Sequence, residues 1–106
     1  MSNAITKIEG QIVRIREELM KLGSMRPGSL SRQYKNRKEK KGAFWQLSYT
    51  HKMKSRTEHV WPEHREGLEK EIAEYRKFKA LTQELIDLSI ERSKANIAYL
   101  RKHSTR

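Results

Sequence analysis

The sequence predicts an α+β fold that is mostly helical, with a small antiparallel sheet between an N-terminal helix and a long C-terminal helix. Near both ends of the 106-residue chain, apolar residues recur every three or four positions, as they do on one face of a helix. In the middle third, apolar and polar residues alternate, which is typical of strands that bury one face. A chain of this length is expected to form one domain, residues 1–106.

Residues 1–23 are predicted to form an amphipathic helix. Its apolar positions alternate in spacings of three and four residues, as in helices that pack on another helix, and they are Ile5, Ile8, Ile12, Ile15, Leu19 and Leu22. Gly23 follows directly, and glycine is favoured just after a helix end because it adopts left-handed backbone angles at no steric cost. We therefore expect the helix to end there.

Residues 62–102 are predicted to form one long helix, followed by a tail at residues 103–106. Pro62 suits the first helical position, where its missing N–H group would have no partner. One apolar stripe, along which we expect the N-terminal helix to pack antiparallel, consists of Leu68, Ile72, Tyr75, Phe78, Leu81, Leu85 and Leu88. A second stripe, on an adjacent face, consists of Ile86, Ile90, Ile97 and Leu100. No other predicted element covers this second stripe, so the sequence favours a homodimer.

Residues 24–61 are predicted to contain a turn and an antiparallel β-meander of two or three strands. Pro27 and Gly28 suit the two central positions of a type II turn. Residues 43–50 alternate between two faces, and residues 55–61 are expected to return beside them as a second strand. Residues 29–34 are the candidate for a third strand, which an isolated hairpin would need for stability.

The positive charge of the chain is concentrated in this middle region. The whole chain has 24 Lys and Arg residues against 13 Asp and Glu, a net charge of +11, and residues 24–61 have ten against two. Such a chain attracts polyanions. It has no cysteine and no long apolar run, which argues against a disulfide scaffold and a membrane-spanning helix. We therefore expect a cytoplasmic protein.

The strongest candidate for a binding surface is the basic run from Lys35 to Lys41, directly before the predicted aromatic strand. Lysine and arginine neutralise phosphates, and exposed aromatic rings stack on bases. The predicted nucleic-acid contacts are Arg32, Lys35, Arg37, Lys38, Lys40, Lys41, Lys52, Lys54, Arg56, Trp45 and Tyr49. Two alternatives stay open: the basic run is a solvated loop, or Trp45, Leu47 and Tyr49 form the buried face of the sheet.

No pattern in the sequence indicates an enzyme or a metal site. His59 and His64 each follow a glutamate, but their spacing matches no recognised metal motif. The chain has no G-x-S-x-G motif and no glycine-rich phosphate-binding loop. We expect no catalytic residue, no bound metal, no cofactor and no small-molecule substrate.

Several linked motifs resemble a small bacterial and archaeal domain family of unknown function. Members of that family typically read G-S-L-x-x-x-Y, then a cysteine-rich loop, then G-P-Y-Y-Y-L-S-Y and a T-R-T-like strand before a long helix. The matching segments here are Gly28-Ser29-Leu30-Ser31-Arg32-Gln33-Tyr34, Gly42-Ala43-Phe44-Trp45-Gln46-Leu47-Ser48-Tyr49, Ser55-Arg56-Thr57, and Glu74-Tyr75-Arg76-Lys77-Phe78 in the charged helix. The resemblance covers about residues 24–90.

The resemblance implies a role connected with DNA, because members of that family are often found near transposase genes. This chain departs from the family at two places. The basic run stands where the family has its cysteine cluster, and Ala43 stands where the family has proline. A zinc site is therefore not implied for this chain.

Taken together, these observations predict a non-catalytic nucleic-acid-binding accessory protein, with DNA as the expected partner and a connection to mobile elements. The alternative is a homo-oligomeric coiled-coil adaptor that binds another protein and uses its charge for solubility. In both cases we expect a homodimer that does not associate with a membrane.

Overall fold

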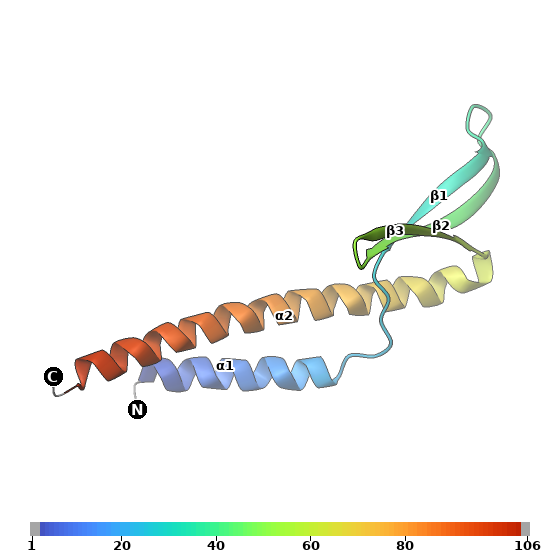
Figure 1. Cartoon of the computed structure of the whole chain (residues 1–106). Helices are drawn as coiled ribbons and strands as arrows, with labels where there is room; N and C mark the ends of the chain where they lie inside the picture. The colour runs from blue at the N-terminus through green and yellow to red at the C-terminus, as the bar shows by residue number, and fades with distance from the viewer. Residues whose placement is uncertain (1–2, 105–106) are drawn as a thin grey trace. The chain divides into compact units, whose positions relative to one another are not determined.

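The computed structural model describes residues 3–104 and has the predicted α+β architecture (Figure 1). The elements in chain order are α1 (Asn3–Met20), β1 (Ser29–Asn36), β2 (Lys41–His51), β3 (Lys54–Val60) and α2 (Pro62–Lys102). The chain divides into two compact units, a helical unit (Met1–Leu22 with Phe78–Arg106) and a sheet unit (Gly23–Lys77). Because α2 contributes residues to both units, the single domain stays a prediction.

In the helical unit, α1 packs antiparallel on the C-terminal part of α2, which confirms the predicted pairing of the two helices. Ile8, Ile12 and Ile15 are buried in one cluster with Leu88 of α2. Partly buried side chains that pack against this cluster are Leu19, Leu81, Leu85 and Ala95. Glu9 and Arg92 form an ion pair between the helices, with 2.6 Å between Oε1 and Nη2.

The predicted apolar stripe of α2 is divided between the two units, so the expectation that α1 follows all of it was wrong. Leu68 and Ile72 instead pack against Leu47 and Val60 of the sheet. The apolar face of a small sheet must be covered, and the first turns of α2 follow β3 directly in the chain. Among residues 3–104, the members of the stripe found in the cluster with α1 are Leu81, Leu85 and Leu88.

The sheet unit contains three antiparallel strands in the order β1-β2-β3, so the third strand is confirmed. Leu47 of the central strand lies opposite Leu30 of β1 and Glu58 of β3. Since alternate residues of a strand point to opposite faces, Leu47 shares its face with Trp45 and Tyr49. This face is covered by the first part of α2, and Leu47 is 0% exposed.

The opposite face of the sheet, which we call the open face, is polar. Among residues 3–104, neither of the two buried apolar clusters includes a residue of this face. Its side chains come from the alternate positions of the three strands and include Ser31, Gln33, Phe44, Gln46, Ser48, Thr57 and His59. The alternation of residues 44–49 predicted from the sequence is therefore the one observed.

The end of α1 differs from the prediction. The helix ends at Met20, and two backbone hydrogen bonds that each span three residues tighten the turn that follows. Gly23 does not adopt left-handed backbone angles. Its N–H group instead donates a hydrogen bond of 3.4 Å to Oε2 of Glu74, so the side chain of α2 satisfies it.

The predicted type II turn around Pro27 is not formed, since residues 22–28 contain no turn. Gly28 does have a positive φ of 136°. A Cβ atom at this position would lie 2.8 Å from Cδ1 of Leu47 and 2.9 Å from the carbonyl oxygen of Ser48. Glycine is required here because the chain passes close against β2, and not because it reverses direction.

The loop between β2 and β3 is a two-residue hairpin turn, at the position predicted. His51 pairs with Lys54, and the two residues between them, Lys52 and Met53, have φ values of 50° and 66°. Such turns need positive φ at both central residues, and glycine or asparagine usually stands there. Lys52 and Met53 therefore hold a strained backbone.

Candidate nucleic-acid interface

The β1–β2 hairpin continues beyond the third strand as a two-stranded arm (Figure 1). The pairing of β2 with β3 reaches only to Trp45, which lies opposite Val60. The pairing of β1 with β2 continues to Asn36 and Lys41. We call residues 33–44 the basic arm, because they contain five Lys or Arg residues and one Glu.

The five cations of the basic arm are exposed, and they are Lys35, Arg37, Lys38, Lys40 and Lys41. Within residues 3–104, only Lys41 has an acidic partner, with Nζ 3.5 Å from Oε2 of Glu39. The side-chain oxygen of Asn36 accepts a hydrogen bond of 3.2 Å from the N–H group of Glu39 and closes the tip. The predicted basic run is therefore the tip of a hairpin with four cations that make no ion pair in the described chain.

Arg32 lies at the base of the basic arm rather than in it. It pairs with Trp45 in the sheet register, and its guanidinium carbon lies 5.7 Å from the centre of the Tyr34 ring. This cation–π contact holds the arginine along the strand. Arg32 thus continues the line of positive charge from the arm toward the sheet.

The remaining predicted cations, Lys52, Lys54 and Arg56, lie at the other end of β2. The strand has 11 residues, so its two ends are about 33 Å apart at 3.3 Å per residue. Arg56 borders a surface pocket of about 570 Å³ whose lining residues are mainly Ser, Thr and Tyr. The structure does not bring these cations together with the basic arm.

Trp45 and Tyr49 lie on the covered face of the sheet. This agrees with the alternative that Trp45, Leu47 and Tyr49 form the buried face, and not with the prediction that the two rings contact nucleic acid. Both are partly buried against the cluster of Leu47, Val60 and Ile72. The guanidinium carbon of Arg65 in α2 lies 5.1 Å from the centre of the Trp45 ring. Both rings therefore pack against the core of the sheet unit and do not lie on the open face.

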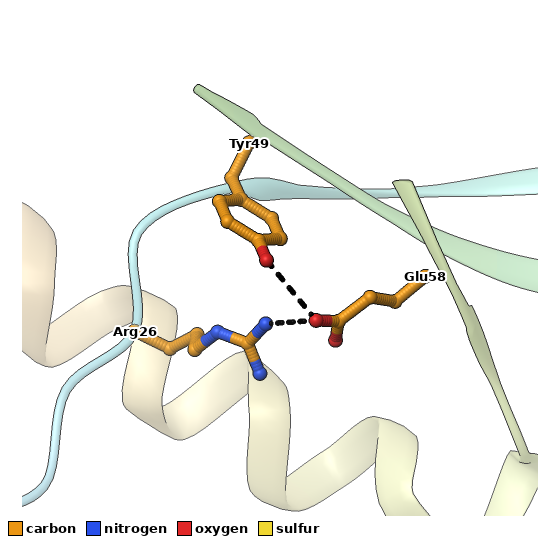
Figure 2. A network of polar contacts seen from close by, with 3 residues as sticks. All are labelled: Arg26, Tyr49 and Glu58. Atoms are coloured by element: carbon orange, nitrogen blue, oxygen red, sulfur yellow. Dashed lines mark hydrogen bonds and ion pairs between the residues drawn. The ribbon is translucent and has the colours of Figure 1, made fainter. Parts of the chain in front are cut away.

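Tyr49 also belongs to a polar cluster that ties the chain before β1 to the sheet (Figure 2). Glu58 Oε1 accepts hydrogen bonds from Arg26 Nη2 at 2.7 Å and from the Tyr49 hydroxyl at 3.2 Å. The pKa of Arg26 is raised above its usual value, mainly by its hydrogen bond to Glu58, so its charge persists throughout the neutral range. The Arg26 guanidinium also lies 5.0 Å from the centre of the Tyr49 ring. This cluster has a structural role.

Three aromatic rings that the site prediction omitted lie on the open face. Phe44 stacks with His59 at a centroid distance of 5.5 Å, and the rings of His59 and Trp61 form a T-shaped contact at a centroid distance of 4.6 Å. Trp61 is 59% exposed. The alternation of the strand did place Phe44 on the face opposite Trp45. The sequence does not show, however, that Trp61 belongs to the same row, which follows from its ring contact with His59.

A pocket of about 420 Å³ lies beside this aromatic row, at the start of α2. Its lining includes His59, His64 and three carboxylates, from Glu58, Glu63 and Glu71. No group of three potential ligands with the geometry of a metal site occurs in residues 3–104. The carboxylates make this pocket unfavourable for phosphate.

No helix in the described part of the chain is both long enough and apolar enough to cross a bilayer. Comparisons with family models, with curated proteins and with solved structures found no match for this chain. The family resemblance of its motifs thus stays an expectation, and the function must be argued from the geometry of the chain itself.

Proposed function

We propose that this chain is a non-catalytic nucleic-acid-binding accessory protein, with DNA as the expected partner, and that the basic arm contacts phosphates. The observation that supports this proposal is the density of positive charge at one hairpin tip. Residues 35–41 contain five exposed cations and one glutamate. Within residues 3–104, four of these five cations have no carboxylate partner. Unpaired cations on a projecting hairpin are well placed for a polyanion.

Binding through phosphates has a measurable signature. Each phosphate neutralised releases counterions, so the logarithm of the binding constant falls with the logarithm of salt concentration, with a slope of about −0.9 per contact on duplex DNA. If all five arm cations contact phosphates, the slope is about −4.5. The base sequence contributes nothing to this part of the affinity.

The test is fluorescence anisotropy with a labelled 20-base-pair duplex and a labelled 20-nucleotide single strand, between 50 and 200 mM salt. The triple variant Lys38→Glu, Lys40→Glu and Lys41→Glu is expected to weaken binding at least 100-fold and to reduce the slope by about 2 to 3. The matched control, Lys7→Glu, Arg14→Glu and Lys21→Glu, makes the same charge change on exposed positions outside the arm. It is expected to weaken binding less than threefold.

Two results would overturn the proposal. One is that the unchanged protein binds neither nucleic acid at 50 mM salt. The other is that the two triple variants weaken binding equally, because the attraction would then depend on net charge and not on the arm. Circular dichroism of both variants establishes that they fold.

A second property, self-association, is favoured by a separate observation on α2. The predicted second stripe is exposed, since Ile86, Ile90, Ile97 and Leu100 each expose 50 to 58% of their surface. The flanking charges are segregated: Glu84, Asp87 and Glu91 precede Lys94, Arg101 and Lys102. No ion pair of these six side chains is formed among residues 3–104. An antiparallel pair of stripes from two copies would set acid opposite base, so we propose an antiparallel homodimer.

Sedimentation at high micromolar concentration tests the dimer. Ile90→Lys with Ile97→Lys is expected to give a monomer, whereas Val13→Lys, an exposed position on α1, is expected to leave the dimer intact. Variants with Lys94→Glu and Arg101→Glu, or with Glu84→Lys and Asp87→Lys, should each be monomeric alone and dimerise when mixed. A monomeric unchanged protein would refute the dimer. A dimer that binds no nucleic acid would favour the adaptor alternative.

A further inference from the structure

The three rings on the open face lie at the base of the basic arm. Trp61 directly follows Val60, the last residue of β3, and Val60 pairs with Trp45, the chain neighbour of Phe44. Phe44 is itself part of the arm, two residues after Gly42. The row Phe44, His59 and Trp61 therefore begins where the phosphate-binding cations end.

Neither Trp61 nor His59 belongs to the apolar core. The buried cluster of the sheet unit and the side chains packed against it lie on the covered face, and they do not include these two residues. A tryptophan that is 59% exposed gains little from burial, although its ring is held in place by the edge contact with His59. A large, positioned and exposed ring of this kind is typical of a contact surface.

One cation and two amide side chains lie beside the row on the same face. Lys35 lies opposite Gly42, and a Cβ atom at Gly42 would be only 3.0 to 3.3 Å from the Lys35 stem. The missing side chain of Gly42 therefore leaves room for this stem across the open face. Gln33 pairs with Phe44, and Gln46 pairs with His59, so two amide side chains flank the rings. Amides offer both a donor and an acceptor to the edge of a base.

We propose that this part of the open face binds the bases of a single-stranded nucleic acid, with bases stacked on Trp61 and Phe44 while the phosphates follow Lys35 and the basic arm. The inference rests on the proposed nucleic-acid binding. It adds that unpaired bases are the ligand, because a duplex keeps the faces of its bases stacked inside. Aromatic rings beside a basic track are the usual combination for single strands. The carboxylates of the adjacent pocket keep the phosphates on the arm side of the row.

The two tryptophans of the chain allow a direct test by fluorescence. In Trp45→Phe the only tryptophan is Trp61, and its emission is expected to be quenched when a 12-nucleotide single strand is added. In Trp61→Phe the only tryptophan is Trp45, which lies in the core, and its emission should change little. Equal quenching of both, or quenching of Trp45 alone, would overturn the inference.

Affinity measurements separate the bases from the phosphates. Trp61→Ala is expected to weaken single-strand binding by about 5- to 150-fold, the effect of removing one stacked ring, while Trp61→Tyr keeps most of the affinity. A single strand of abasic sugar phosphates should bind the unchanged protein and Trp61→Ala alike. The salt slope should be the same for both, because no cation has been removed.

The outcomes distinguish this inference from the proposed function. If single strands bind with the expected salt slope but Trp61→Ala has no effect, the stacking site is wrong and the basic arm still binds phosphates. If the charge reversal on the arm has no effect but Trp61→Ala weakens binding, the arm is wrong and the aromatic row is supported. A preference of the unchanged protein for duplex over single strand would contradict the stacking site alone.

Discussion

The helical unit and the sheet unit differ in how they use charge. The helical unit has ten basic and six acidic residues, whereas the sheet unit has fourteen and seven. In the first part of α2, Arg65, Lys70 and Lys77 are each paired with a glutamate three or four residues away. The excess of basic over acidic residues in the sheet unit therefore lies in its strands and hairpins, above all in the basic arm.

This difference indicates a division of roles. A helix with intermingled charges presents a solvated face, and its exposed apolar stripe is then the feature left for assembly. A hairpin with unpaired cations and nearby rings offers charge and stacking to a ligand. The two cores are small, and each depends on a few side chains, so single substitutions should affect one unit more than the other.

The largest effect is expected for Leu47→Ala in the sheet unit. Leu47 is 0% exposed, and replacing a buried leucine by alanine costs roughly 2 to 5 kcal/mol, near 4 where the site is fully enclosed. Urea unfolding followed by tryptophan fluorescence reports this unit, since Trp45 and Trp61 both lie in it. Circular dichroism at 222 nm follows the helices. Coincident shifts of both signals would show that the units unfold together, and an unshifted fluorescence midpoint would refute the prediction.

A somewhat smaller loss, about 3 kcal/mol, is expected for Gly28→Ala. The φ of 136° is open mainly to glycine, and the new methyl group would lie within 3 Å of β2. Gly67→Ala is the matched control, because its Cβ would meet nothing within 4 Å on α2. The control is expected to raise stability by about 1 kcal/mol through helix propensity. Equal effects of the two substitutions on the urea midpoint would contradict this account of Gly28.

The helix and strand assignments were accessible from the sequence because they depend on short-range periodicity. The spacing of Ile5 to Leu22 and the alternation around Leu47 each specify one face of one element. The sequence did not show that the α2 stripe is divided between two partners, because the division depends on which element packs against each helical turn of α2. The turn at Lys52 and Met53 was placed correctly from the two strands beside it, although neither residue is the glycine or asparagine typical of such a turn.

For the candidate site, charge was a better guide than aromatic content. The basic run could be located from the sequence because hairpin tips are exposed whatever the fold around them. Which of the rings is exposed could not be predicted from the sequence. Phe44 and Trp45 are neighbours on opposite faces of the sheet, and only the packing of α2 determines which face is covered. The row with Trp61 depends on two features that the sequence does not show. One is the pairing of β3 with β2, which sets His59 opposite Gln46, and the other is the contact between the rings of His59 and Trp61.

A gain of about 1 kcal/mol is expected for Met53→Gly at the β2–β3 turn. Left-handed backbone angles cost a non-glycine residue about 1 to 2 kcal/mol, and part of this is offset by the greater flexibility of glycine in the unfolded chain. Met53 is 96% exposed, so no packing is lost. The gain should appear in the fluorescence midpoint of the sheet unit. A loss of stability would show that the turn is not strained.

The smallest effect, about 0.5 kcal/mol, is expected for Arg92→Met in the helical unit. Arg92 donates two hydrogen bonds to Oε1 of Glu9, at 2.6 and 3.0 Å, but both side chains are substantially exposed and water screens the pair. The loss should vanish in 1 M salt. Arg26→Met, in the sheet unit, should lower the free energy of unfolding by about 1 kcal/mol. Part of this loss should remain at 1 M salt, because the cation–π contact of Arg26 with the Tyr49 ring is less sensitive to screening than an exposed ion pair. If the two losses respond identically to salt, the polar cluster at Tyr49 adds nothing to a simple ion pair. The contrast between the units would then lie only in where their unpaired charges are placed.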